Sequence, residues 1–436
     1  MAGQAEAYAA RFARRNLTAL LMDAASFLFG VAVFDAVAVV PILLAKLGAP
    51  PALIGSTYLT QVLGYAVPAM IAAHLIHGRP NHKKFLLVTA GIGRLLIISL
   101  PFGIMIAGRR HPTLGAVWIM ASTAGFWFFD GCCAVSWTDI VAKTVVPRAR
   151  AFFFGMLQML GGLSAIAAGA VVVFVLRTSG LGFPTDYAVL AACWAIGGMG
   201  SLFSLSLIRE PPGATIEKED RPTFWQFVAE GGRLFNKNLR VRTIVVARWL
   251  LSANGLALPF FAVYAQQDLG VPEAMVGLYI VVRSLGRILA GPVWGWASHR
   301  RGPSVAVRWV SMFVAAAPAI AVFAWKPSAF LMAAVFFMQG LTDDGLWTSC
   351  QNALYESVSD IERPLAVGAV TVALAPAAMY GVVGGVIVQL FGYKPAFVLA
   401  ATLAACGAAV AWRLPKLPSA GLPIAPSPST HNAIAP

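Results

Sequence analysis

The sequence predicts an all-α polytopic membrane protein, with twelve transmembrane helices in two pseudo-symmetric six-helix bundles. Composition is the first observation: the chain is 59% hydrophobic and only 11% charged, with a mean hydropathy of +0.76. A soluble domain carries about 25% charged residues. The second observation is a series of apolar runs of 18 or more residues, separated by short charged clusters, which is typical of membrane helices.

The third observation is an internal repeat. Asp139 and Arg150 recur without a gap as Asn352 and Arg363, 213 residues later, and both copies follow an apolar run that contains an Asp-Gly pair. Two copies lie on the same side of a membrane only if an even number of spans separates them. Six spans in this interval leave about 35 residues for each helix and its connection, which is what a helix of ~20–25 residues needs.

The apolar runs place the spans in order along the chain. In the first half we expect spans at 17–46, 53–76, 85–107, 114–137, 151–176 and 186–208. In the second half we expect them at 241–264, 273–297, 305–325, 328–350, 365–390 and 395–413. The resulting organisation is a cytoplasmic segment 1–16, a bundle 17–208, a linker 209–240 with an interfacial helix, a bundle 241–413, and a disordered Pro- and Ser-rich tail 414–436.

The net charge of +14 is explained by topology rather than by a nucleic-acid partner. Most of the 32 Lys and Arg residues fall in segments on the same side as the N-terminus. The other side holds only Lys46, Arg109, Arg110, Arg177, Lys326 and Lys394. The positive-inside rule therefore predicts a multi-pass protein of the cytoplasmic (inner) membrane with both termini in the cytoplasm.

Charged residues inside spans are the best candidates for a binding site, because each costs about 2.5–3.5 kcal/mol at the middle of a span. Arg283 and Arg287 are four residues apart and share one helical face, which suits bidentate binding of an anionic substrate. The alternative is that they pair with aspartates and fix helix packing. The full set of candidates for substrate or coupling-ion binding is Asp35, Asp130, Arg248, Arg283, Arg287, Asp343 and Asp344.

Metal chemistry is not expected. The five cysteines fall in predicted spans without metal-ligand spacing, and His74, His77 and His82 lie beside lysines at a helix end. We predict no metal site and no cofactor, and the sequence has no nucleotide-binding P-loop.

Two loop motifs resemble the major facilitator superfamily. The segment Gly295 to Pro303 resembles the family pattern G-x-x-x-D-R-x-G-R between spans 8 and 9: Gly295, Arg300 and Gly302 match, whereas His299 replaces the aspartate and Pro303 replaces an arginine. The equivalent loop HLIHGRPNHKK is weaker, and the stretch GGVIVQLFGYKPAF is also similar to the family. The resemblance implies two six-helix bundles with substrate held between them near the middle of the bilayer. Span 4 lacks the arginine of the family's drug–proton antiporters, and this disfavours that activity.

The missing loop aspartates leave the family's usual cytoplasmic lock in doubt. Asp139 and Glu356 are candidates to replace it by pairing with Arg79, Arg300 or Arg301, and the alternative is that all are solvated surface charges worth about 0–1 kcal/mol each. The complete set of cytoplasmic gate candidates is Arg79, Lys83, Asp139, Arg150, His299, Arg300, Arg301, Asn352, Glu356 and Arg363.

Together these features predict a secondary active transporter, not an enzyme, that moves a small solute by alternating access. The solute is anionic if the arginine pair binds it. The expected partners are a small-molecule substrate, the lipid bilayer and protons or another coupling ion, and we expect a monomer that binds no nucleic acid. Two alternatives stay open. One is a transporter-like sensor or assembly protein without translocation, and the other is a membrane-embedded enzyme acting on lipid-linked substrates.

Overall fold

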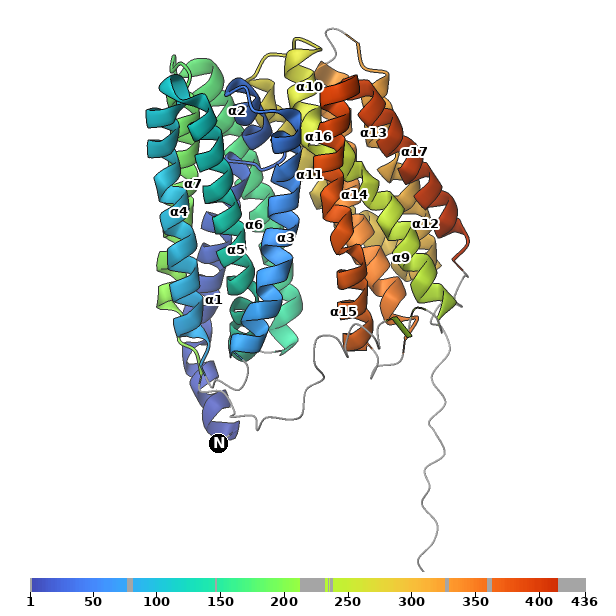
Figure 1. Ribbon diagram of the computed structural model, residues 1–436. Helices are drawn as coiled ribbons and strands as arrows, with labels where there is room; N and C mark the ends of the chain where they lie inside the picture. Colours follow the sequence, from blue (N-terminus) through green and yellow to red (C-terminus); the bar gives the residue numbers. More distant parts are fainter. Residues whose placement is uncertain are drawn as a thin grey trace, which may run out of the picture.

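A computed structural model describes residues 2–76, 81–145, 147–211, 232, 233, 235, 238–325, 329–358 and 363–414. These residues form helices and connections and contain no strand. Most of the predicted linker and the tail beyond Leu414 lie outside the described residues, as does the predicted interfacial helix. Figure 1 shows the helices in two groups that follow the two halves of the sequence.

The first group contains the N-terminal half of the chain. Its elements are α1 (Ala2–Val33), α2 (Val39–Lys46), α3 (Pro51–Ile76), α4 (Lys83–Arg110), α5 (Pro112–Thr144), α6 (Pro147–Val173), a π-helical turn η1 (Phe174–Thr178) and α7 (Thr185–Leu207). Within the group α1 packs against α6 and α7, and α5 packs against α3 and α4.

The second group contains the C-terminal half. Its elements are α9 (Leu239–Leu251), the 3-10 turns η2 (Ser252–Leu256) and η3 (Leu258–Phe260), α10 (Phe261–Gln267), α11 (Met275–Arg301), α12 (Pro303–Val314), α13 (Ala316–Val322), α14 (Ala329–Tyr355), α15 (Arg363–Leu374), the 3-10 turn η4 (Ala375–Met379), α16 (Tyr380–Phe391) and α17 (Tyr393–Trp412). Here α14 packs against α11 and α12, and α17 packs against α9.

Each predicted span corresponds to helical structure, but four spans are broken where one continuous helix was expected. The run 17–46 is interrupted between α1 and α2, and 241–264 is interrupted between α9 and α10. The runs 305–325 and 365–390 are interrupted between α12 and α13 and at η4. Proline explains several breaks, since Pro259, Pro318 and Pro376 lie at or just after them and have no N–H for the helical ladder.

Ten helical stretches among the described residues are long and apolar enough to cross a membrane. The other two predicted spans, 53–76 and 328–350, form α3 and α14, and α14 carries Asp343 and Asp344 in its interior. The protein is therefore an all-α, multi-pass membrane protein.

The two groups meet along the helix pairs α3–α16 and α6–α11. Glycines allow this approach: a Cβ at Gly55 would lie 1.9 Å from the carbonyl oxygen of Gly381, and one at Gly277 would lie 2.4 Å from that of Gly169. In Figure 1 the groups lie close together at the end that carries α2 and α10, and they diverge toward the end that carries the N-terminus and α15. The contact between the groups is thus concentrated toward one end of the molecule.

Candidate functional site

An ion cluster joins the two groups of helices. Arg283 on α11 lies 3.4 Å from Oδ2 of Asp35, at the α1–α2 break, and 3.3 Å from Oδ2 of Asp343 on α14. The other oxygen of Asp35 accepts the backbone N–H groups of Val37 at 2.9 Å and Ala38 at 2.7 Å, at the start of α2. The helix break therefore holds Asp35 in place. Two carboxylates face one guanidinium in this cluster.

The second predicted arginine is also paired. Arg287, one turn along α11, binds Asp344 at 2.9 Å, and both side chains are about half exposed. They line a cavity of about 490 Å³ between α6, α11 and α14. Arg283 and Arg287 are therefore both paired with carboxylates in this structure. This geometry favours the alternative in which the two arginines pair with aspartates.

Arg248 differs from these two. It lies on α9 and has no ion pair or side-chain hydrogen bond with any of the described residues. It lines a pocket of about 260 Å³, the central pocket, together with Arg283 and Asp343. The Oδ1 atom of Asn254, another lining residue, is buried without a hydrogen-bond partner among the described residues. The central pocket therefore offers an unpaired cation and an unsatisfied amide oxygen.

The central pocket adjoins a larger one. This large cavity, of about 1070 Å³, is lined by Gln61, Val62, Leu63, Tyr65, Ala66, Val67, Ile71, Leu75, Trp127, Arg248, Trp347, Gln351, Val370, Thr371, Val372, Leu374 and Ala375. Gln61, Arg248 and Trp347 line both cavities. The lining elements α3 and α15 belong to different halves and lie on the side where Figure 1 shows the groups diverging. A solute entering between the halves would meet Arg248 on its way to the central pocket.

Asp130 belongs to a separate buried network. Arg94 on α4 lies 3.5 Å from Asp130 on α5 and donates a hydrogen bond of 3.1 Å to Ser201, which donates one of 2.6 Å to Asp23. Trp137 also donates to Asp23, at 3.0 Å. All these residues belong to the first half, so the geometry favours a packing role for Asp130 over the predicted substrate or ion role. Asp23 was not among the predicted site residues.

At the end that carries α2 and α10, where the two groups of helices lie close together, the structure has contacts that were not predicted from the sequence. Lys46, the last residue of α2, pairs with Glu273, just before α11, at 2.5 Å. Glu273 also accepts a hydrogen bond from the Tyr187 hydroxyl of α7. The ammonium of Lys46 lies 5.3 Å from the centre of the Tyr187 ring. One carboxylate of the second half is therefore bound by two residues of the first half. All three residues lie at predicted loops or helix ends, where a charge gives little signal in sequence.

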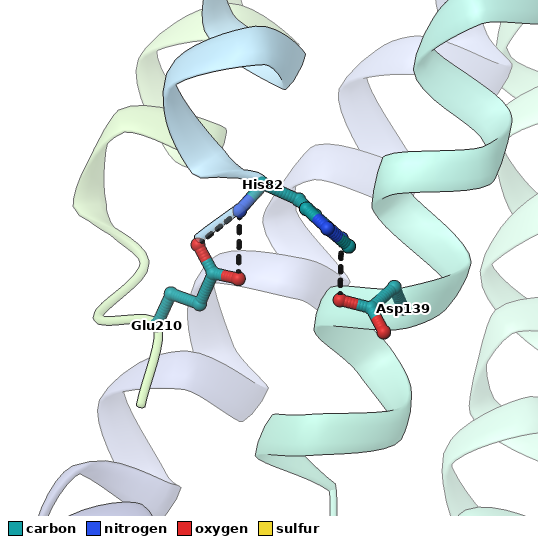
Figure 2. Close-up of side chains that lie close together, drawn as sticks. All are labelled: His82, Asp139 and Glu210. Atoms are coloured by element: carbon teal, nitrogen blue, oxygen red, sulfur yellow. Dashed lines mark hydrogen bonds and ion pairs between the residues drawn. The ribbon is translucent and has the colours of Figure 1, made fainter. Parts of the chain in front are cut away.

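At the opposite end Asp139 pairs within its own half. Its Oδ2 lies 2.7 Å from Nδ1 of His82 and 2.6 Å from Nζ of Lys143, and Figure 2 shows His82 between Asp139 and Glu210. Glu210 accepts the backbone N–H of His82 at 3.0 Å and lies 3.1 Å from Lys143. His82, Asp139 and Glu210 are close enough to hold a metal ion. However, the Lys143 ammonium already pairs with both carboxylates. These residues therefore form an ion-pair network that connects the helix ends of the first half, rather than a metal centre.

The remaining gate candidates are not brought together by this structure. Lys83 donates to the carbonyls of Ser206 at 2.7 Å and Ile208 at 2.6 Å, again within the first half. His299, Arg300 and Arg301 end α11, and Asn352 lies near the end of α14. Arg79 and the side chains of Arg150 and Arg363 lie outside the described residues.

Glu356 follows α14 and is exposed. Partial burial raises the pKa of its carboxyl, and the charge of Arg240 opposes that shift. Its pairing with Arg300 or Arg301 stays a prediction.

Comparison with known proteins agrees with this architecture. Residues 248–436 match the family model described as Major Facilitator Superfamily. The fold is similar to that of a mutant of the nucleoside transporter NupG, with a TM-score of 0.68 and 15% identity, over 92% of this chain and 100% of that one. A bacterial homologue of the iron transporter ferroportin in an inward-facing state gives a TM-score of 0.68 and 15% identity, over 92% and 98%.

The peptide transporter POT in complex with sulfate gives a TM-score of 0.66 and 14% identity, over 92% and 93%. No curated protein matches the sequence. The family match thus covers the C-terminal part of the chain, and the similarity of fold to these transporters extends over 92% of it.

Proposed function

We propose that this protein is a secondary transporter of the cytoplasmic membrane that carries a small anionic solute by alternating access, with Arg248 binding the anionic group. One observation carries the proposal: the Arg248 guanidinium has no ion pair among the described residues and lines both the large cavity and the central pocket. An unpaired cation in a membrane interior is costly, and a negatively charged solute would compensate it. A planar guanidinium also suits bidentate binding of a carboxylate or phosphate.

The alternating-access part of the proposal rests on the asymmetry between the two ends. Lys46 and Tyr187 bind Glu273 where the halves meet, whereas the large cavity lies where they diverge. This is the arrangement expected of a carrier accessible from one side. With the orientation given by the positive-inside rule, the accessible side is the cytoplasm and both termini lie there.

The cluster of Arg283, Asp35 and Asp343 supports a coupling role. Two carboxylates share one guanidinium, so one negative charge is left over unless a proton or another cation binds. The cluster joins the halves and borders the central pocket. We therefore assign it the binding of the coupling ion, a role that the sequence predicted for these same aspartates.

Counterflow in proteoliposomes tests the proposal. Liposomes preloaded with an unlabelled organic anion should take up the labelled anion through the wild-type protein, and Arg248→Gln should reduce the rate at least tenfold because the charge-assisted hydrogen bonds are lost. The matched control is Arg242→Gln, an exposed arginine on the same helix that lines neither cavity. Absence of exchange with a broad panel of solutes would support the sensor alternative, and unchanged exchange in Arg248→Gln would remove the arginine from the site.

A further inference from the structure

The large cavity has an apolar wall on α3. Val67, Ile71 and Leu75 are spaced four residues apart, so they share one helical face. Their exposed fractions are 48%, 48% and 51%, and all three line the cavity. An apolar face on an outer helix surface is covered by lipid, but this one lies between the two halves. It therefore needs an apolar partner of another kind.

The opposite wall has the same character. Leu374 of α15 lines the same cavity with Val370, which is only 2% exposed, and Trp347 of α14 is 56% exposed there. Besides Arg248, the hydrogen-bonding side chains that line the cavity within the described part of the chain are those of Gln61, Tyr65, Gln351 and Thr371, and the indoles of Trp127 and Trp347. Ten of the seventeen residues named above as lining this cavity have purely apolar side chains, so the cavity suits a solute with an apolar body.

A solute that enters the large cavity would meet the apolar surface first and the charge of Arg248 second. The apolar side chains line the large cavity, and Arg248 stands where that cavity joins the central pocket. The volume of about 1070 Å³ is that of a site for a drug-sized molecule, and such sites combine apolar walls with a few fixed polar groups. A small inorganic anion would leave most of this wall uncovered.

We propose that the transported solute is an amphipathic organic anion. Its charged head binds Arg248, and its apolar body of several carbons packs against the α3–α15 wall formed by Val67, Ile71, Leu75, Val370 and Leu374. This inference rests on the proposed function, which it deepens by naming the class of the substrate. Specificity then comes from two separable contributions, a head contribution that depends on Arg248 and a body contribution that depends on the wall.

A homologous series separates the two contributions. Binding of butyrate, hexanoate and octanoate to the full-length protein in nanodiscs would be measured by calorimetry, with empty nanodiscs as the blank for partitioning into lipid. The wild type should bind more tightly with each two added methylenes, by up to about 15-fold where both are fully buried, because each buried methylene contributes a fixed increment. Hexanol, which lacks the charge, should bind at least tenfold more weakly than hexanoate.

Variants assign the contributions to residues. Ile71→Ser should weaken octanoate about three- to tenfold and leave butyrate unchanged. Arg248→Gln should weaken all three carboxylates by a similar factor and leave hexanol unchanged. The matched control is Ile92→Ser, since Ile92 of α4 is also partly exposed and lines none of the cavities described for this chain.

The outcomes distinguish the proposed substrate class from the proposed function as an anion transporter. Two results would overturn the amphipathic class while still supporting an anion carrier. In the first, affinity depends on Arg248 but does not change with the chain length of the carboxylate. In the second, Ile71→Ser and the wild type bind octanoate equally well. Equal effects of Ile71→Ser and Ile92→Ser would also overturn it, because a general effect on the bilayer face would then explain the loss. Binding with the expected pattern but no counterflow would support the substrate class and refute transport.

Discussion

Single residues in this protein are best understood through their partners. Arg283 and Arg248 are both arginines of the C-terminal half beside the central pocket, yet one is bound by two aspartates and the other by none of the described residues. The sequence predicted both as candidates and favoured Arg283, because its partner Asp35, 248 positions away, could not be identified from the sequence. Pairing across such a separation is decided by helix packing. Asp130 makes the same point, since its partner Arg94 lies on another helix, α4, and was not among the predicted site residues.

The charge count of the ion cluster leads to a prediction for Asp343→Asn. The change leaves Arg283 with Asp35, a balanced pair, so the protein should fold and should still catalyse counterflow. It should lose accumulation driven by a pH gradient, because the surplus carboxylate that takes the proton is gone. Uptake in liposomes with and without an imposed pH gradient measures both quantities.

The control for the cluster is Asp268→Asn, which removes an exposed carboxylate that has no ion pair among the described residues. This variant should accumulate substrate as the wild type does. If Asp343→Asn also accumulates substrate normally under a pH gradient, the cluster is a packing device and the coupling ion binds elsewhere.

At the scale of elements, every run predicted as a span contains helical structure, and ten stretches are long and apolar enough to cross a membrane, but the breaks within the runs were not predicted. Apolar runs continue through 34–38, 252–260 and 375–379, so hydropathy alone gives single helices there. The breaks arise from prolines and, at Asp35, from a side chain that accepts backbone N–H groups in place of the helical ladder. The first two of these segments line the central pocket, and 375–379 lines the large cavity through Ala375, so the breaks that hydropathy misses lie beside the candidate site.

The glycine contact between α3 and α16 gives a prediction at the same scale. A Cβ at Gly381 would lie 2.3 Å from the carbonyl oxygen of Gly55, so Gly381→Ala must push two backbones apart. We expect it to lower the free energy of unfolding by roughly 1–3 kcal/mol, as overpacked sites do, and to slow counterflow. Thermal unfolding of the purified protein and a transport assay would measure the two effects.

Gly91→Ala is the matched control for this substitution. Gly91 lies within α4 with no atom near the position of an added Cβ, so alanine there should be neutral or stabilise by up to about 1 kcal/mol. Equal stability of the two variants would show that the α3–α16 contact tolerates separation and does not hold the halves together.

For the molecule as a whole, the two-bundle architecture followed from the repeat, but the state in which the halves are found did not. A sequence repeat indicates that two halves exist and leaves their relative tilt undetermined. The relative tilt of the halves depends on contacts at the end that carries α2 and α10. The main contact there, within the described part of the chain, is the binding of Glu273 by Lys46 and Tyr187. These residues gave no sequence signal because charges are common in connections.

Glu273→Gln tests whether this contact controls which side of the molecule is accessible. The change removes the ion pair with Lys46 and weakens the hydrogen bond from Tyr187, and a hydrogen bond to a charged group contributes about 1.5–3 kcal/mol. A loss of that size shifts a two-state equilibrium by roughly tenfold or more. Hydrogen exchange followed by mass spectrometry should then show faster exchange in α2 and α10 and slower exchange in α3 and α15 near the large cavity.

The reciprocal change is the decisive part of that measurement. If the halves rock as rigid bodies, opening one end must close the other, so protection lost in α2 and α10 is regained around Leu75 and Leu374. Asp268→Asn, at the same end but without an ion pair among the described residues, should change neither region. Faster exchange at both ends of Glu273→Gln would mean that the contact only stabilises the fold, and alternating access would then need a different gate.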